Sequence, residues 1–78
     1  MVKLYGRPGC QPCRATRRKL QQLGVPFTEV SADMHLGYLR SLGYASAPVI
    51  EVDCGGGATA HWSGYRPDLI LELSETLS

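Results

Sequence analysis

The sequence contains no long hydrophobic run and has almost no net charge. Its apolar runs are a few residues long, whereas a membrane-spanning helix needs about 20 apolar residues. Its formal net charge of +1 gives no broad basic surface for nucleic acid or an anionic membrane. Residues 1–5 resemble a strand and lack the basic and apolar regions of a signal peptide. We therefore expect a cytoplasmic protein, or one of the host cytoplasm if the gene is viral, that binds neither nucleic acid nor membranes.

Cysteine is also scarce. Three cysteines is an odd number for a short chain, whereas secreted disulfide frameworks have even numbers. In a reducing cytosol, Cys10 and Cys13 are typical of redox or metal chemistry, because only two residues separate them. The 78 residues, 44% of them hydrophobic, suffice for one core but not for two. We expect one monomeric domain over residues 1–78.

Hydrophobic spacing predicts an α/β domain with the element order β-α-β-α-β-β-α. Strands are indicated by β-forming residues between turn residues, and helices by apolar residues at every third or fourth position. The predicted strands cover residues 2–5, 25–30, 48–52 and 59–62. The predicted helices cover residues 11–23, residues 31 or 33 to 42, and residues from Pro67 onward. This order gives a four-stranded mixed sheet flanked by three helices, with a glycine-rich hairpin loop at residues 55–57.

Cys10 is expected at the N-terminus of the first helix, and Cys13 in its first turn, facing the core. Unpaired N–H groups and the helix dipole favour a thiolate at this end of a helix, so we expect a lowered pKa for the Cys10 thiol. Nearby Arg7 and Arg14 are expected to add to this effect. Cys10 is then the nucleophile that attacks a substrate disulfide, and Cys13 resolves the mixed disulfide.

A zinc site is the alternative use of the same cysteines. Cys54 and His61 would complete a set of four ligands of recognised types. Structural zinc sites usually present two closely spaced pairs, whereas Cys54 and His61 are seven residues apart across a glycine-rich loop. The redox interpretation is therefore preferred, no metal is expected, and Cys54 is interpreted as a bystander on a hairpin.

Three segments together resemble the NrdH-redoxins, a group of glutaredoxin-like proteins. They are YGRPGCQPC at residues 5–13, LGYASAPV at residues 42–49 and HWSGYRPD at residues 61–68. The resemblance covers nearly the whole chain, and the string W-S-G-aromatic-R-P-D is its most distinctive part. It implies a thioredoxin fold with a cis Ala47–Pro48 bond beside the dithiol, where the backbone of residue 47 pairs with an extended substrate. The alternative for Pro48 is the first residue of an edge strand.

The resemblance also implies an activity and its partners. It implies a thiol-disulfide oxidoreductase without a bound cofactor, which donates electrons to class Ib ribonucleotide reductase. Thioredoxin reductase would restore the dithiol with electrons from NADPH. A glutathione-dependent glutaredoxin is the alternative within the same fold.

The third segment borders the groove where glutaredoxins hold glutathione, and here it is bulky and contains proline. The resemblance therefore implies poor affinity for glutathione. The expected substrate-binding and partner-binding residues are Arg7, Ala47, Pro48, Trp62, Ser63, Gly64, Tyr65 and Arg66. Core packing explains Trp62 equally well. Pro12, which replaces a usual non-proline residue, and the long hairpin at residues 53–60 depart from the family pattern.

Overall fold

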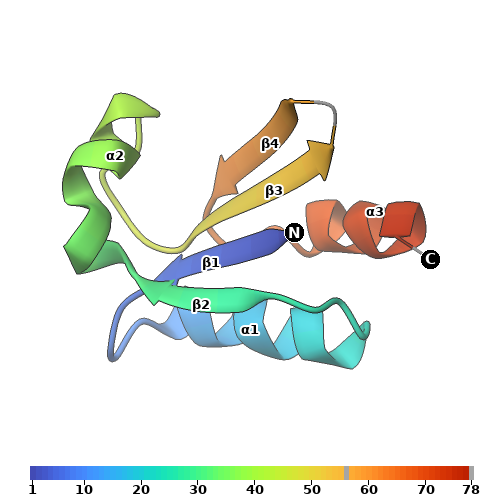
Figure 1. The fold of residues 1–78 in the computed structure, drawn as a ribbon. Coiled ribbons are helices and arrows are strands. Elements are labelled where there is room, and N and C mark those ends of the chain that lie inside the picture. Colours follow the sequence, from blue (N-terminus) through green and yellow to red (C-terminus); the bar gives the residue numbers. More distant parts are fainter. Residues whose placement is uncertain (56, 78) are drawn as a thin grey trace.

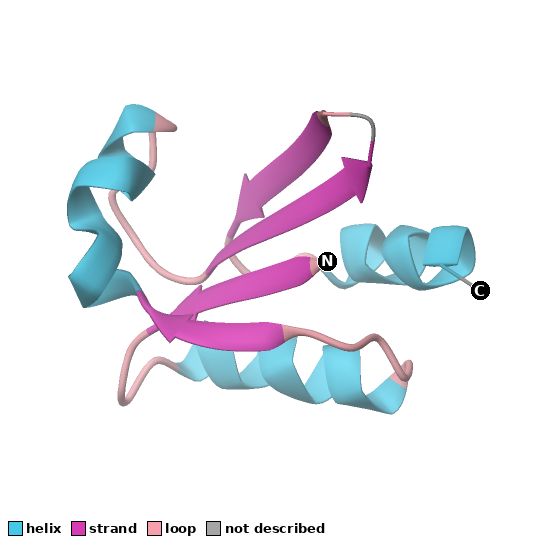
Figure 2. Ribbon diagram, in the orientation of Figure 1, coloured by secondary structure: helices cyan, strands magenta, loops and turns pink. Residues whose placement is uncertain are grey.

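The structure is a computed structural model that describes residues 1–55 and 57–77, so Gly56 of the predicted hairpin loop lies outside it. Its strands are β1 (Val2–Gly6), β2 (Thr28–Ser31), β3 (Val49–Gly55) and β4 (Ala58–Ser63). Its helices are α1 (Gln11–Gln22), a 3-10 helix (Ala32–His35), α2 (Leu36–Ser41) and α3 (Pro67–Leu77). Figures 1 and 2 show this arrangement, which confirms the predicted element order. In the described part of the chain, no helix is long and apolar enough to cross a bilayer.

The four strands form one mixed sheet in the order β2-β1-β3-β4. β1 runs parallel to β2 and antiparallel to β3, and β3 runs antiparallel to β4. Tyr5 lies opposite Val49, and Val49 lies opposite Ser63. The carboxyl ends of β1, β2 and β4 and the start of β3 therefore lie together at one end of the strands. This end is called the dithiol edge below, and it is distinct from the outer edge strands β2 and β4. The chain enters α1 from this edge, which positions the cysteines.

Alternating side chains divide the sheet into two unequal faces. On one face Leu4 and Ile50 lie in register and pack with Leu20 of α1 and Ile70 of α3. These four side chains are completely buried, and they form the centre of the larger core cluster. On the opposite face, a smaller cluster is built around Tyr5, Ala32, Leu39 and Val49. Figure 1 shows α1 and α2 on opposite sides of the sheet.

The structure confirms that α1 is an amphipathic helix, as the spacing of its apolar residues predicts. Cys13, Thr16 and Leu20 recur at steps of three and four residues, and all three are buried. Thr16 avoids an unpaired buried hydroxyl because its Oγ1 donates a hydrogen bond to the Pro12 carbonyl, 2.8 Å away. Pro12 lies in the first turn, where no intrahelical acceptor is available for its missing N–H. The proline is therefore compatible with the helix start.

Strand β2 is shorter than predicted, because it begins at Thr28 and not at Val25. The Val25 N–H donates to the Leu20 carbonyl at 2.9 Å, which ties this residue to the end of α1. Pro26 has no N–H to give to a strand ladder. Val25 is nevertheless buried, and Phe27 packs against the larger core cluster. These apolar residues therefore fill the core from a connection, and not from a strand.

The second predicted helix is divided into two short pieces. A 3-10 helix follows Ser31, and the Ser31 side chain makes no capping hydrogen bond. α2 then begins at Leu36, and of its predicted inward leucines only Leu39 is buried, whereas Leu36 and Leu42 are half-buried. A helix this short covers one end of the sheet face, next to Tyr5 and Val49. The sheet is thus flanked by three α-helices as predicted, but the single helix predicted to end at residue 42 is a 3-10 helix followed by a short α-helix.

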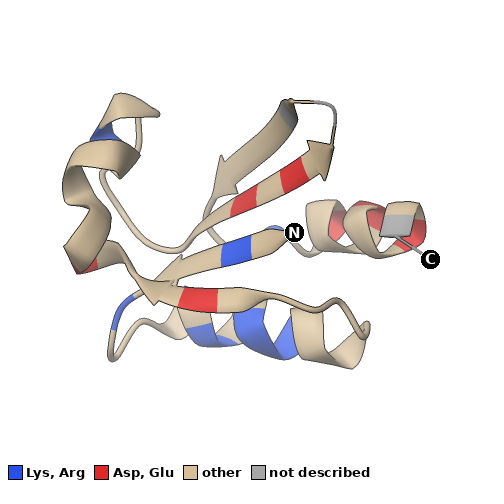
Figure 3. Cartoon of the chain, viewed as in Figure 1, with Lys and Arg blue, Asp and Glu red and all other residues tan. Residues whose placement is uncertain are grey.

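Replacing Glu29 by glutamine should weaken the fold in a pH-dependent way. Arg17 Nε donates to Glu29 Oε1 at 2.7 Å, joining α1 to β2, and this hydrogen bond lowers the pKa of Glu29. Figure 3 shows basic positions along α1 next to an acidic position on β2. Both side chains of the pair are more than a third exposed, so we expect a loss of about 0.5 kcal/mol at pH 7. A lowered carboxyl pKa stabilises the fold above the ordinary value of 4.5, and this contribution is lost as pH falls through the lowered pKa.

Urea denaturation of the wild type and the Glu29→Gln variant, at pH 7 and again at an acidic pH where the fold persists, measures this effect. Glu72→Gln on the exposed side of α3 is the control, and it should cost nothing at either pH. An equal loss at both pH values would contradict the ion-pair explanation.

Candidate active site

Cys10 and Cys13 form a disulfide across the first turn of α1. Cys10 is the N-cap residue with an extended backbone, and its Sγ accepts a hydrogen bond from the Cys13 N–H at 3.2 Å. Cys13 is 1% exposed, whereas Cys10 is half-buried. The predicted placement of both cysteines is therefore confirmed. Cys10 is the sulfur that another molecule can reach, and its position favours a thiolate after reduction because the helix end is positive.

The loop from Gly6 to Gly9 positions Cys10. Gly9 has a φ of +71°, in the left-handed region that glycine adopts without strain. Gly6 lies against the buried sulfur, because a Cβ built on Gly6 would be 3.8 Å from Cys13 Sγ and 3.3 Å from Glu29 Oε2. The space beside β1 is thus filled by the dithiol turn itself. A Cβ at residue 6 would therefore crowd the Glu29 carboxylate and be in ordinary van der Waals contact with Cys13.

Pro48 lies at the same edge of the sheet and follows a cis peptide bond, as predicted. It is fully buried, and it immediately precedes Val49, the partner of Tyr5 in the sheet. β3 is a central strand between β1 and β4, so the alternative of an edge-strand proline is wrong. The Pro48 carbonyl accepts a hydrogen bond from the Gly64 N–H at 2.9 Å. Gly64 has a φ of +86°, so glycine suits the turn out of β4.

The other predicted partner-binding residues occupy different environments. Ser63 is half-buried opposite Val49, which places it at the dithiol edge of the sheet. Trp62 lies opposite Ile50 and packs against the larger core cluster, so its expected packing role is confirmed. Tyr65 is exposed. A role for these residues in binding partners stays a prediction.

Arg66, the residue before α3, binds Asp68 in the first turn of this helix. Its Nε and Nη2 donate to the two carboxylate oxygens at 3.2 Å and 3.0 Å. These hydrogen bonds lower the pKa of Asp68, and the backbone N–H of Leu69 lowers it further. Both side chains are exposed. The first turn of α3 therefore already holds an anion of the chain itself.

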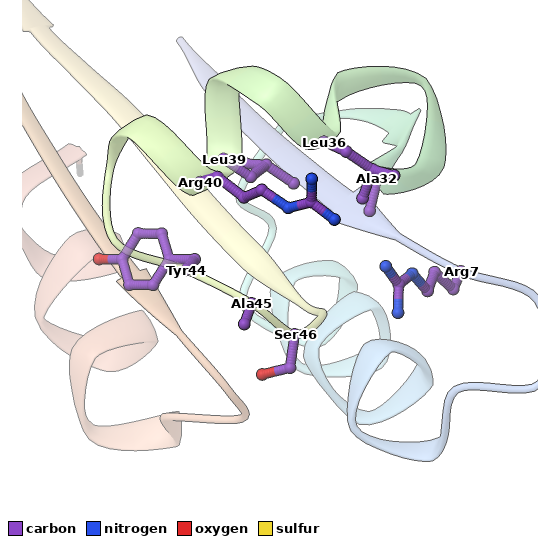
Figure 4. Close-up of a pocket in the computed structure, with 8 residues that line it drawn as sticks. All are labelled: Arg7, Ala32, Leu36, Leu39, Arg40, Tyr44, Ala45 and Ser46. Carbon is purple, nitrogen blue, oxygen red and sulfur yellow. The ribbon is translucent and has the colours of Figure 1, made fainter.

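Arg7 marks a cavity that the sequence did not reveal. Arg7 Nε lies 2.9 Å from Asp33 Oδ1, which is close enough for an ion pair. Arg7 Nε nevertheless makes no hydrogen bond to any of the described residues. The cavity has a volume of about 140 Å³ and lies between the Arg7 loop and α2, with Arg40 and Tyr44 in its wall. Figure 4 shows both guanidinium groups directed into it. No local pattern identifies Arg40, because its approach to residue 7 depends on how α2 packs on the sheet.

The alternative zinc ligands are not brought together. His61 Nδ1 is 2.7 Å from the Tyr44 hydroxyl, and Cys54 is an exposed free cysteine on β3. Among residues 1–55 and 57–77, no three His, Cys, Asp or Glu side chains form a group that could hold a metal ion. The four-ligand interpretation is therefore not supported by the fold.

Comparisons with known proteins agree with this geometry. The Glutaredoxin family profile matches residues 2–54. The glutaredoxin-like protein NrdH of Salmonella typhimurium is 32% identical over 96% of this chain and 90% of its own length. The gene 56 protein of Mycobacterium phage L5 is 32% identical over 92% of this chain and 70% of its own.

Solved structures confirm the thioredoxin fold. The NrdH-redoxin of Escherichia coli superposes with a TM-score of 0.79 at 31% identity, covering 92% of both chains. Chloroplastic thioredoxin z shares the fold with a TM-score of 0.72 at 19% identity, covering 97% of this chain and 75% of its own. The chain therefore belongs to the glutaredoxin family, with the NrdH glutaredoxin-like proteins, and is a dithiol–disulfide oxidoreductase.

Proposed function

We propose that the protein is a cytoplasmic electron carrier that reduces class Ib ribonucleotide reductase and is itself reduced by thioredoxin reductase. The observation that supports the proposal most is the pairing of a reachable Cys10 with a buried Cys13 in a glutaredoxin-sized domain related to NrdH proteins. The relative from E. coli was described as having a thioredoxin-like activity profile, which favours thioredoxin reductase as the source of electrons.

The reaction proceeds through a mixed disulfide. The Cys10 thiolate attacks one sulfur of the partner's disulfide, the partner's S–S bond breaks, and its second sulfur leaves as a thiolate that takes up a proton. The Cys13 thiol then loses its proton and attacks Cys10 Sγ, which releases the first partner sulfur as a thiol. The partner gains two electrons and two protons, and the protein is left with the Cys10–Cys13 disulfide.

The binding surface proposed for the partner is the edge of the sheet beside the dithiol. Within residues 1–55 and 57–77, the backbone of Ala47 makes no hydrogen bond to another residue. An extended partner segment can therefore pair with it as an added strand. Pro48 follows this position in the chain, and Ser63 and Gly64 lie across from it through the strand register and the hydrogen bond from the Gly64 N–H to the Pro48 carbonyl. Arg7 shares a cavity wall with Ser46, the residue before Ala47. Trp62, Tyr65 and Arg66 extend the proposed surface toward α3.

No bound cofactor is proposed, because the two cysteines carry the electrons and the reductase supplies them from NADPH. Glutathione is the competing reductant. The first turn of α3 is an anion-binding position in principle, but the Asp68 carboxylate already accepts hydrogen bonds there from Arg66 and from the Leu69 N–H. A carboxylate of glutathione would have to compete with this internal anion, which supports thioredoxin reductase.

The choice of reductant is tested by measuring NADPH consumption. The assay contains the protein, thioredoxin reductase and insulin, whose disulfides are the substrate. We expect turnover with thioredoxin reductase, and a rate at least about tenfold lower with glutathione and glutathione reductase. Oxidised class Ib ribonucleotide reductase in place of insulin tests the partner. Turnover supported only by glutathione would contradict the proposal and make the protein a glutathione-dependent glutaredoxin.

A further inference from the structure

We propose that the cavity between Arg7 and Arg40 binds the carboxylate of an aspartate or glutamate that lies near the target cysteine in the partner polypeptide. This inference rests on the proposed function, because it assigns the partner's chemistry at the same sheet edge. Arg7 is three residues before Cys10, and Ser46, also in the cavity wall, is two residues before Pro48. The cavity therefore adjoins both loops that flank the dithiol (Figure 4).

Charge is the first argument for a carboxylate. Two guanidinium groups enter the cavity, and none of the described residues that line it is acidic. Asp33 neutralises Arg7 from outside the lining, through the 2.9 Å contact between Arg7 Nε and Asp33 Oδ1. In the described part of the chain, Arg40 has no ion-pair partner. The cavity thus keeps one uncompensated cation, and an entering anion would relieve the repulsion between two like charges.

Size and surroundings restrict which anion fits. The volume of about 140 Å³ is well below the roughly 300 to 1,000 Å³ of small-molecule sites, but it suffices for the end of one acidic side chain. Leu36, Leu39 and the Tyr44 ring supply apolar walls beside the two guanidinium groups, while the Arg7 and Arg40 side chains stay open to solvent on their other side. A carboxylate held there makes charge-assisted hydrogen bonds, and the planar guanidinium matches both carboxylate oxygens.

The position fits a side chain of an extended partner segment. A strand advances about 3.3 Å per residue, so a segment paired with Ala47 carries its side chains past Ser46 and the cavity within a few residues. Tyr44 is fixed by its 2.7 Å contact with His61 Nδ1, which holds this wall of the cavity against β4. The acidic residue would therefore set the register of the partner's cysteine on Cys10.

Single-turnover reduction of peptide disulfides tests the inference. Each peptide carries one cysteine in a mixed disulfide with 2-mercaptoethanol, and aspartate occupies in turn each position from three before to three after the cysteine. A matched series carries asparagine. Each turnover converts the peptide disulfide and the protein dithiol into two free thiols and the Cys10–Cys13 disulfide, and mass spectrometry after acid quenching counts the products. The protein is reduced chemically beforehand, so no reductase is needed.

For the wild type at low salt, we expect one aspartate position at which the aspartate peptide is reduced about tenfold faster than its asparagine match. Arg40→Gln should lower this ratio to about one, and Arg7→Gln should lower it in part. Asp33→Asn, which frees Arg7, should raise the ratio, a change that a merely structural role of these arginines would not produce. Arg18→Gln on the exposed side of α1 is the control and should keep the wild-type ratio.

Two results would overturn the inference alone. The first is reduction of all peptides at equal rates, and the second is an equal loss of the ratio in the Arg18→Gln and Arg40→Gln variants, which would show a general effect of charge. Failure to reduce any peptide would instead contradict the proposed function, and with it the inference that rests on it.

Discussion

Replacing Cys10 by serine is expected to lower disulfide reductase activity about a thousandfold or more. The reason is that Cys10 supplies the attacking sulfur, and a serine hydroxyl does not exchange with a disulfide. Cys10 is half-buried while Cys13 is 1% exposed, so Cys13 cannot take over the attack from its buried position. Insulin reduction with a chemical reductant, compared between variants at equal concentration, measures the loss.

Two further cysteine variants separate the roles in this reaction. Cys13→Ser should attack a substrate but accumulate as a mixed disulfide, which mass spectrometry of the trapped complex detects. Cys54→Ser is the control, because Cys54 is an exposed free cysteine outside the disulfide. It should keep the wild-type rate. Substantial activity in the Cys10→Ser variant, or its loss in the Cys54→Ser variant, would show that the nucleophile is wrongly assigned.

Replacing Ile70 by alanine is expected to cost about 2 to 5 kcal/mol of unfolding free energy. Ile70 of α3 is completely buried in the larger core cluster, so the shorter side chain removes apolar contacts and leaves a cavity. A small domain has roughly 5 to 15 kcal/mol of stability, so this single change removes a large part of it. Urea denaturation of the oxidised protein measures the change.

The adjacent Leu71 provides a matched control in the same helix. Its side chain is 46% exposed, so Leu71→Ala should change the unfolding free energy by no more than about 0.5 kcal/mol. Alanine favours helix at both positions, so helix propensity does not explain a difference between them. Equal losses in the two variants would contradict the assignment of the buried face of α3.

The sequence predicted those features that depend on local patterns. Helix α1 and its buried face followed from the spacing of Cys13, Thr16 and Leu20 and from the turn residues before Cys10. The order of strands and helices followed for the same reason. The cis Ala47–Pro48 bond came only from the family resemblance, because local sequence does not determine the isomer.

The sequence failed where tertiary contacts override local preference. Val25 and Phe27 are β-forming and apolar, but they fill the core from a connection because Val25 remains bound to the end of α1. Arg40 belongs to the cavity because α2 packs over the end of β1, a contact between segments far apart in sequence. The Arg66–Asp68 ion pair, by contrast, could have been predicted from the sequence, since only one residue separates the two charges.

A redox titration of the intact chain tests the central claim most directly. The protein is equilibrated in dithiothreitol buffers of graded potential, its free thiols are alkylated, and mass spectrometry counts the labels on each cysteine. We expect Cys10 and Cys13 to gain labels together in one two-electron transition, in which the ratio of reduced to oxidised protein changes tenfold for about 30 mV, while Cys54 is labelled throughout. Labelling of Cys10 and Cys13 in separate transitions, or protection of Cys54 together with either of them, would contradict the claim that Cys10 and Cys13 form the redox-active pair.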